Sequence, residues 1–203
     1  NGNYSTALGL QTSAGGNGST AIGALTIASG NNSTAAGYTT TASGLYSTAM
    51  GFTTIANGAA STAMGNSSNA TGDYSTAMGS TTTASGLASI AMGNGSSATG
   101  DYSTAMGHFT TASGIYSSAK GYFTAASGGF TSTSGFLTKA KGDASTAIGS
   151  NTIAKGYSST VVGLYNDSIL TTNQTTISPA TPLFIVGNGD NNATRSNALT
   201  VLK

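Results

Sequence analysis

Apolar and polar positions alternate along this chain in short runs that recur every fourteen residues. The phrase GDYSTAMG stands at 72–79 and again at 100–107, and GLASIAMG lies half-way between them at 86–93. Each fourteen-residue unit has two halves, G-x-x-S-x-A-φ and G-x-x-T-x-A-x, where φ is usually an apolar residue. Self-similarity at a fixed period is typical of a solenoid, in which each repeat stacks on the one before it.

The glycines keep this period without a slip. One set of twelve recurs every fourteen residues from Gly9 to Gly163, and a second set of twelve runs from Gly2 to Gly156, offset by seven. Frequent glycine and β-branched threonine oppose a helix, whereas alternation fits strands. We expect glycine at each half-boundary to supply a positive φ or the close approach that a turn needs. The sequence therefore predicts an all-β fold, with two short strands and two turns per coil of a flat parallel β-solenoid.

The two faces of each predicted strand have different side chains. Successive side chains point to opposite faces, so the Ser/Thr and Ala positions, two residues apart, are predicted to meet inside the coil. In the first half these columns run from Ser5 to Ser159 and from Ala7 to Ala147. They hold small residues because a fourteen-residue coil leaves almost no interior.

The φ position points outward and is apolar in most units. Burying one large apolar side chain contributes roughly 1.5–3 kcal/mol, and a soluble monomer rarely exposes a contiguous apolar stripe. We therefore predict an obligate oligomer in which these stripes meet, which favours a closed ring. The predicted interface residues are Leu8, Ile22, Met50, Met64, Met78, Met92, Met106, Ile148 and Val162.

Composition removes several classes of function. The 203 residues include no cysteine, 5% charged residues and a net charge of +1, so neither disulfides nor a basic surface for nucleic acid or membrane lipids is predicted. The longest apolar run, Leu183–Val186, is too short to span a bilayer. Low charge would fit disorder, but the strict period argues against it. Because the chain begins at Asn1 without methionine or signal peptide, we expect a processed product or a fragment.

The sequence predicts no catalytic residue, metal site or cofactor. His108 is the single histidine, glutamate is absent, and the five aspartates are scattered. Asp101, His108 and the many serines include the residue types of a hydrolytic triad, but a lone surface histidine in a repeat is far more often incidental. The GNG phrases at 93–95 and 187–189 precede no helix and are interpreted as turns. We therefore expect a protein that is not an enzyme.

Aromatic residues gather at both predicted turns. At the first turn, one interpretation is packing between chains, and the other is a ladder that contacts glycans or a host surface. Its candidate contact residues are Tyr46, Tyr74, Tyr102 and Tyr116, in register with Tyr4 and Phe130. The second turn is expected to line the edge of the oligomer with Tyr38, Phe52, His108, Phe109, Tyr122, Phe123 and Phe136.

The repeated phrases resemble the head repeats of YadA-like trimeric autotransporter adhesins. STAIG occurs at 19–23 and 145–149, and STAMG at 47–51, 61–65, 75–79 and 103–107, so the resemblance covers about residues 2–165. It implies a left-handed parallel β-roll of twelve coils, with three chains around one axis and the S-x-A-φ-G strand facing that axis. It also implies a bacterial cell-surface location or a fibre of a phage or similar particle.

The φ column departs from the family pattern at Lys120 and Ser134. In a trimer, three Lys120 side chains would converge on the axis, and their repulsion would require an anion or a water cluster between them. Alternatively, the roll loosens here and each lysine reaches outward to solvent. The neighbouring departures at Gly129, Phe130, Thr131 and Thr133 favour a local irregularity.

The period fails from about Asp167. We predict a β-roll over 1–165, a linker over 166–182 that contains Pro179 and Pro182, and a C-terminal hairpin or neck over 183–203. In this last segment an apolar strand, a GNGDNN turn and the alternating strand Asn197–Leu202 follow one another. The segment resembles the connector after such heads in secreted surface fibres, so we expect the natural chain to continue past Lys203.

Two functions fit this sequence. The first is a rigid extracellular head or fibre segment that attaches to a host, matrix or glycan surface, or associates with itself into filaments. The alternative is an ice- or crystal-surface binder, since flat threonine arrays on β-solenoids can match ordered water. Threonine pairs such as Thr39/Thr41 and Thr81/Thr83 support the alternative, although Thr53/Ile55 and Ser67/Asn69 interrupt the array.

Overall fold

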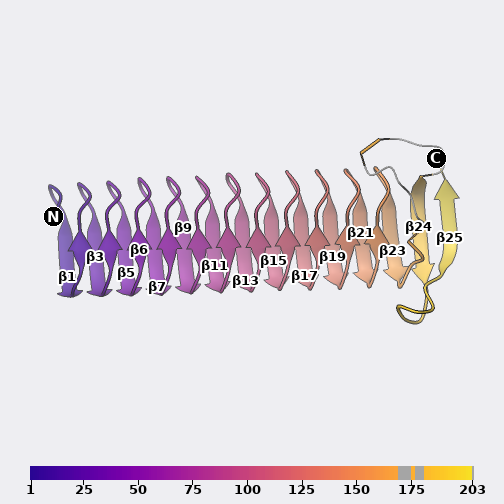
Figure 1. The fold of residues 1–203 in the computed structure, drawn as a ribbon, viewed down its shortest axis with the longest axis horizontal. Helices are drawn as coiled ribbons and strands as arrows, with labels where there is room; N and C mark the ends of the chain where they lie inside the picture. The colour runs from indigo at the N-terminus through magenta and orange to yellow at the C-terminus, as the bar shows by residue number, and fades with distance from the viewer. Residues whose placement is uncertain (169–174, 177–180, 203) are drawn as a thin grey trace. The chain divides into compact units, whose positions relative to one another are not determined.

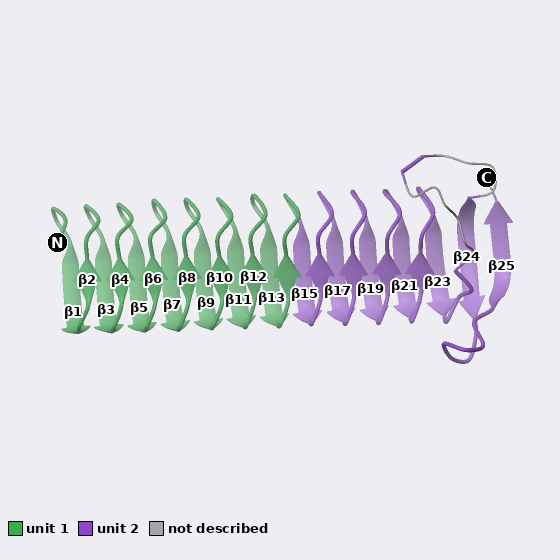
Figure 2. Ribbon diagram, viewed as in Figure 1, with its two compact units in different colours: residues 1–102 green, residues 103–203 purple. Residues whose placement is uncertain are grey.

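The fold is all-β, as predicted. The computed structural model describes residues 1–168, 175–176 and 181–202, and these residues contain strands and turns but no helix. The chain divides into two compact units, 1–102 and 103–203 (Figure 2). In each unit, long strands of five residues alternate along the chain with short strands of two residues (Figure 1).

Unit 1 contains seven long and seven short strands. Like strands pair in parallel with a shift of fourteen residues, so Met78 pairs with Met64 on one side and with Met92 on the other. The long strands are β1 (Thr6–Leu10), β3 (Thr20–Ala24), β5 (Thr34–Tyr38), β7 (Thr48–Phe52), β9 (Thr62–Asn66), β11 (Thr76–Ser80) and β13 (Ile90–Asn94). The short strands are β2 (Ser13–Ala14), β4 (Ile27–Ala28), β6 (Thr41–Ala42), β8 (Ile55–Ala56), β10 (Asn69–Ala70), β12 (Thr83–Ala84) and β14 (Ser97–Ala98).

Unit 2 repeats this arrangement with the same shift, so Ala105 pairs with Ala119. Its long strands are β15 (Thr104–His108), β17 (Ser118–Tyr122), β19 (Ser132–Phe136), β21 (Thr146–Ser150) and β23 (Thr160–Leu164). Its short strands are β16 (Thr111–Ala112), β18 (Ala125–Ala126), β20 (Lys139–Ala140) and β22 (Ile153–Ala154). The predicted parallel β-solenoid with fourteen-residue coils is confirmed.

The interior is built from alanine, serine and threonine, which confirms the predicted inner face. Ala77, Ser75 and Thr82 are each fully buried, and the equivalent positions of other coils match them. Some serine hydroxyls close the turn before the long strand: that of Ser47 donates to the carbonyl of Gly44 at 2.7 Å. Because alanine buries little apolar area, backbone hydrogen bonds between coils hold much of the fold together.

The column glycines serve close stacking, whereas other residues make the turns. Gly79 lies inside β11 with a φ of 131°, and a Cβ there would overlap the carbonyl oxygen of Gly93. The left-handed turn positions are instead held by residues such as Tyr74 and Thr81, with φ of 59° and 55°. The expected positive φ and close approach are therefore confirmed for the first-set glycines. At the left-handed turn positions, however, glycine stands only at Gly18 and Gly95 among the described residues, and other residues hold the rest.

The roll ends before its twelfth coil is complete, so the predicted count of twelve coils is wrong by about one. No short strand follows β23 within residues 165–168. Asn166 stands there in the threonine column and is fully buried. Its Oδ1 accepts the backbone N–H of Ile153 at 2.7 Å, and its Nδ2 donates to the carbonyl of Ile153 at 3.1 Å. The side-chain amide thus replaces the strand that would have paired with β22.

Two further strands extend the long-strand sheet of unit 2. β24 (Pro182–Asn188) pairs in parallel with β23, which places Val186 beside Val162. β25 (Asn197–Leu202) then pairs antiparallel with β24. Arg195 fixes the intervening turn by donating from one guanidinium nitrogen to the carbonyls of Asn151 and Asn166, at 2.8 and 3.1 Å.

The division of the C-terminal part into linker and hairpin or neck stays a prediction. Pro179 and most of the predicted linker 166–182 lie outside the described residues, as does Lys203. Near this end the interior holds larger side chains than elsewhere. Val161 and Ile185 form one buried apolar cluster with Ala140, Ala147 and Ala154.

Leucine at an interior position should destabilise the roll. We expect Ala77→Leu to lower the free energy of unfolding by about 1–3 kcal/mol, because the site is sized for a methyl group. The matched control Ser85→Leu lies on the exposed face of the same unit and should change stability by less than ~0.5 kcal/mol. Denaturant unfolding followed by circular dichroism measures both, and equal tolerance at the two sites would contradict the assignment of faces.

Asn166→Ala should also destabilise the fold. The substitution leaves the N–H and C=O of Ile153 without their side-chain partners, and an unsatisfied buried polar group costs about 1–3 kcal/mol. We expect a lower melting temperature than for Asn94→Ala, which removes an exposed asparagine from unit 1. A melting temperature equal to that of the control would show that Asn166 does not close the coil.

Candidate functional site

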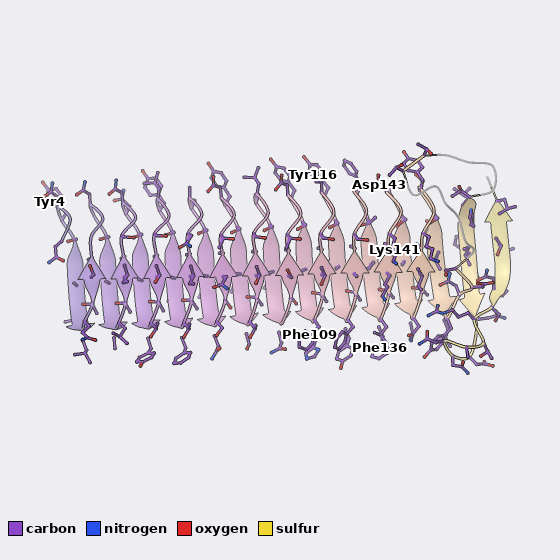
Figure 3. The ribbon with its side chains drawn as sticks, in the orientation of Figure 1. Tyr4, Phe109, Tyr116, Phe136, Lys141 and Asp143 are labelled. Carbon is purple, nitrogen blue, oxygen red and sulfur yellow. The ribbon has the colours of Figure 1, made fainter. Side chains whose placement is uncertain are left out.

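Three sets of outward side chains can meet other molecules. The φ column lies on the long-strand sheet. The first turn edge holds the turn before each long strand, and the second turn edge holds the turn after it. In unit 2, Tyr116 and Asp143 lie at the first edge, Phe109 and Phe136 lie at the opposite second edge, and Lys141 lies between the edges (Figure 3).

The φ column is uncovered in the single chain. In unit 1, Leu8 is 65% exposed and Met50 is 40% exposed, while Met64, Met78 and Met92 are half-buried. Ile22 in unit 1 and Met106 and Ile148 in unit 2 are likewise exposed, and Val162 is half-buried. The register pairs each residue with the same position of the next coil within its unit. The fold thus orders these residues into an apolar row in unit 1, whereas in unit 2 Lys120 and Ser134 separate Met106 from Ile148 and Val162.

Lys120 and Ser134 keep the regular register. Lys120 pairs with Met106 and with Ser134, and Ser134 pairs with Ile148. Both side chains are exposed. The local irregularity expected here is therefore not observed in the strand pairing, and the departures change side chains rather than the path of the backbone.

The first turn edge carries the candidate contact tyrosines in a strained conformation. Tyr46, Tyr74, Tyr102 and Tyr116 have φ between 55° and 59° and are 47–66% exposed. In unit 1, Ala60 and Ala88 stand at the same position in alternate coils. In unit 2, Tyr116 stacks on Phe130 with ring centroids 5.1 Å apart. The structure thus brings Tyr116 and Phe130 together, whereas alanine coils separate the tyrosines of unit 1.

The second turn edge forms a stacked ladder in unit 2. His108 stacks on Tyr122 at 4.8 Å, and Tyr122 stacks on Phe136 at 5.2 Å, with planes within 5° of parallel. Beside them, Phe109 stacks on Phe123 at 5.1 Å. Both faces of the Tyr122 ring are covered by its neighbours, whereas Phe109, Phe123 and Phe136 remain 41–47% exposed.

The aspartates of the roll have a structural role that the sequence analysis missed. The Oδ1 atom of Asp73 accepts the backbone N–H of Ala59, one coil earlier, at 2.8 Å. Asp101 and Asp143 do the same for Leu87 and Gly129, at 2.9 and 2.8 Å. The sequence signal is the recurrence of Asn or Asp directly after the second-set glycine, at Asn3, Asn17, Asn31, Asp73, Asp101 and Asp143.

The residue types considered for catalysis have packing or backbone partners. The His108 ring packs against Tyr122 and Phe109, and Asp101 accepts the N–H of Leu87. Within the described ranges, no three His, Cys, Asp or Glu side chains gather where they could hold a metal ion. Among those residues, no helix is long and apolar enough to cross a membrane.

The two threonines of each pair do not lie on one flat strand. Thr39 and Thr81 occupy left-handed turn positions with φ of 55°, while Thr41 and Thr83 lie on the short strands β6 and β12. The outward column of the short strands in unit 1 is also chemically mixed: Ser13, Ile27, Thr41, Ile55, Asn69, Thr83 and Ser97. A regular threonine lattice that could match ordered water is therefore absent from this column.

Comparison with known proteins agrees with this geometry. The family model of the YadA head domain repeat matches residues 1–26, 28–54, 56–82, 84–110, 98–124 and 140–166, and leaves 125–139 unmatched. A search of curated proteins found no match. The family and the fold together indicate a structural, adhesin-like protein of the bacterial cell surface. With matches over most of its length, this chain belongs to the family of YadA head domain repeats.

Proposed function

We propose that this chain is the head of a homotrimeric surface adhesin, in which the φ column of each chain faces a threefold axis. The observation that carries the proposal is the apolar row on the long-strand sheet, which one chain leaves exposed or half-buried. A contiguous exposed apolar surface on a soluble protein marks an interaction site. Identical apolar rows on identical chains can bury one another when the chains assemble around one rotation axis.

The energetics favour association through this row. Each large side chain of the column contributes roughly 1.5–3 kcal/mol when fully buried. The interior of a single coil, built of alanine, serine and threonine, supplies far less apolar burial. Assembly therefore provides the hydrophobic core that the single chain lacks.

The short-strand sheet supports the same orientation. The first residue of each short strand stands three residues before a second-set glycine and points outward. In β10, β12 and β14 this residue is Asn69, Thr83 and Ser97. Long-strand positions in the same unit hold Met64, Met78 and Met92. The short-strand sheet and the two turn edges would then face the surroundings, where they could contact a host, matrix or glycan surface, or another head.

Adhesion itself is tested with beads that carry the protein. We expect coated beads to attach to host cells or to immobilised extracellular matrix more strongly than uncoated beads. Attachment to neither surface would contradict an adhesive role, and formation of filaments by the protein alone would favour the fibre function. The ice- or crystal-binding alternative has no support from the mixed column of the short strands.

Lys120 and Ser134 give the axis a polar segment in this proposal. Three Lys120 side chains around one axis would repel one another, so we propose that an anion or a water cluster lies between them, next to the ring of Ser134. The regular register on both sides of Lys120 supports convergence of the three side chains.

An axial anion predicts a specific salt effect on the trimer. At equal ionic strength, sulfate should raise the melting temperature of the wild type more than chloride does, and Lys120→Met should reduce that difference to the general stabilisation that sulfate gives folded proteins. Lys139→Met, which removes an exposed lysine from the short strand β20, should leave the difference unchanged. If Lys120→Met shows the same difference as Lys139→Met, no anion is bound at Lys120.

Charges introduced into the φ column should dissociate the trimer. Changing Met64, Met78 and Met92 together to Asp places nine carboxylates around the axis, and a buried unpaired charge costs several kcal/mol. Sedimentation equilibrium should show monomers or unfolded chains. The matched control changes Asn69, Thr83 and Ser97 to Asp on the short strands of the same unit, and it should stay trimeric. A trimeric triple-Met variant of unchanged thermal stability would mean that another face forms the interface.

A further inference from the structure

Gly129 is a glycine that the backbone does not require. It lies outside both glycine columns, and its φ is not in the left-handed region. A Cβ added to Gly129 would come no closer than 3.7 Å to any neighbouring atom, the nearest being Oδ1 of Asp143. A Cβ on the preceding column glycine, Gly128, would lie 2.7 Å from the carbonyl oxygen of Gly142. The missing side chain at Gly129 therefore needs an explanation other than coil stacking.

The missing side chain opens a recess at the first turn edge of unit 2. In three consecutive coils the same position holds Ile115, Gly129 and Asp143, so the glycine leaves a gap between two larger side chains. The equivalent position in unit 1 is occupied by Leu45 and Leu87 in two of the coils. The recess is lined by Ser113, Gly114, Ile115, Ser127, Gly129, Phe130 and Asp143.

An aromatic ring forms one side of this recess. Phe130 is 67% exposed, although a phenylalanine side chain has no polar group that favours water. Tyr116 covers one face of the ring, with centroids 5.1 Å apart and planes 14° from parallel. One coil further on, the same position holds Ala144, whose methyl group is too small to cover the other face. The recess thus offers a flat aromatic surface.

Polar groups lie beside this surface. Asp143 uses Oδ1 to accept the N–H of Gly129 at 2.8 Å, which fixes the carboxylate and leaves Oδ2 as a charge-assisted acceptor. The exposed Ser113 and Ser127 add hydroxyl groups. An apolar ring face beside a carboxylate and hydroxyls matches a sugar ring, which has an apolar C–H face and a rim of hydroxyl donors.

The recess also lies where the chain departs from its family. Residues 125–139, which contain Gly129 and Phe130, form the longest stretch that the repeat model leaves unmatched between its first and last matches. The coil there keeps its strand register. The departure therefore alters the surface while the scaffold is maintained, as expected for a site of specific recognition.

We propose that this recess binds a neutral pyranose residue of a glycan, stacked on Phe130 and hydrogen-bonded to Asp143. The inference rests on the proposed adhesive function and names the class of ligand for it. The only ionised group among the lining residues is the carboxylate of Asp143, which disfavours an acidic sugar and makes a neutral one the better match.

Each residue of the site can be changed to one that other coils already hold at the same position. Gly129→Leu fills the recess with the residue found at Leu45 and Leu87. Phe130→Ala follows Ala60 and Ala144, which share its left-handed conformation. Asp143→Asn follows Asn3, Asn17 and Asn31, and keeps an Oδ1 acceptor while removing the charge. Folding of all three variants is therefore expected.

Binding is measured on an array of glycans with neutral hexose, sialylated and sulfated termini, followed by calorimetry with the neutral glycan that gives the strongest signal. We expect wild-type protein to bind neutral hexose termini. Gly129→Leu and Phe130→Ala should each weaken binding at least tenfold, and Asp143→Asn severalfold. Ala59→Leu, at the same position in unit 1, should bind like the wild type.

Four results would overturn the inference. The first three are the absence of binding to any neutral glycan, binding only to acidic glycans, and neutral-glycan binding that Gly129→Leu leaves intact. The fourth is dissociation of the Phe130→Ala trimer. Sedimentation of the wild type and of every variant separates failure of the recess from failure of the proposed function. If the wild type is a trimer that attaches to surfaces, and the variants bind the glycan array as the wild type does, only the glycan site is refuted. If the wild type is monomeric or attaches to no surface, the adhesin function is refuted. Dissociation of the Phe130→Ala trimer would instead place the recess at a contact between chains.

Discussion

The close approach of successive coils at their glycines is the constraint on which the rest of the structure depends. At Gly79 the carbonyl of Gly93 occupies the space that any Cβ would need. This contact recurs in coil after coil and allows strands fourteen residues apart to pair in parallel, in register and without bulges. One inserted or deleted residue would move every later glycine away from its partner, so the period admits no slip.

Because successive coils pair in exact register, residues at the same position of each coil line up in a column. The interior column of alanine side chains leaves no room for larger side chains, so little hydrophobic stabilisation is available inside one chain. The outward φ residues produce an apolar row, and the Asn and Asp side chains produce a chain of caps over backbone N–H groups. The stability of one chain therefore depends on the backbone hydrogen bonds between coils and on these side-chain caps more than on apolar burial in its core.

The strands, the inner face and the φ column could be predicted from the sequence because each follows from period and alternation alone. The left-handed turns at Tyr74 and Thr81 could not be predicted, since bulky and β-branched residues are poor markers of that conformation and only the stacking of neighbouring coils enforces it. The role of Asn166 was also missed: its side-chain amide makes the two hydrogen bonds to Ile153 that a neighbouring backbone strand would make. Nor could the role of Gly129 be predicted, because the sequence does not distinguish a glycine that opens a recess from a glycine that permits close packing.

The in-register shift of fourteen residues also makes length a quantity that evolution can adjust almost freely. Each coil pairs only with its two neighbours, so whole repeats can be gained or lost while every remaining contact is preserved, and each changes the reach of the roll by about 4.8 Å. The coding sequences of repeated phrases such as GDYSTAMG, 28 residues apart, can recombine out of register, which adds or removes whole repeats. A lineage could thus vary how far such a head extends from the cell without redesigning any part of it.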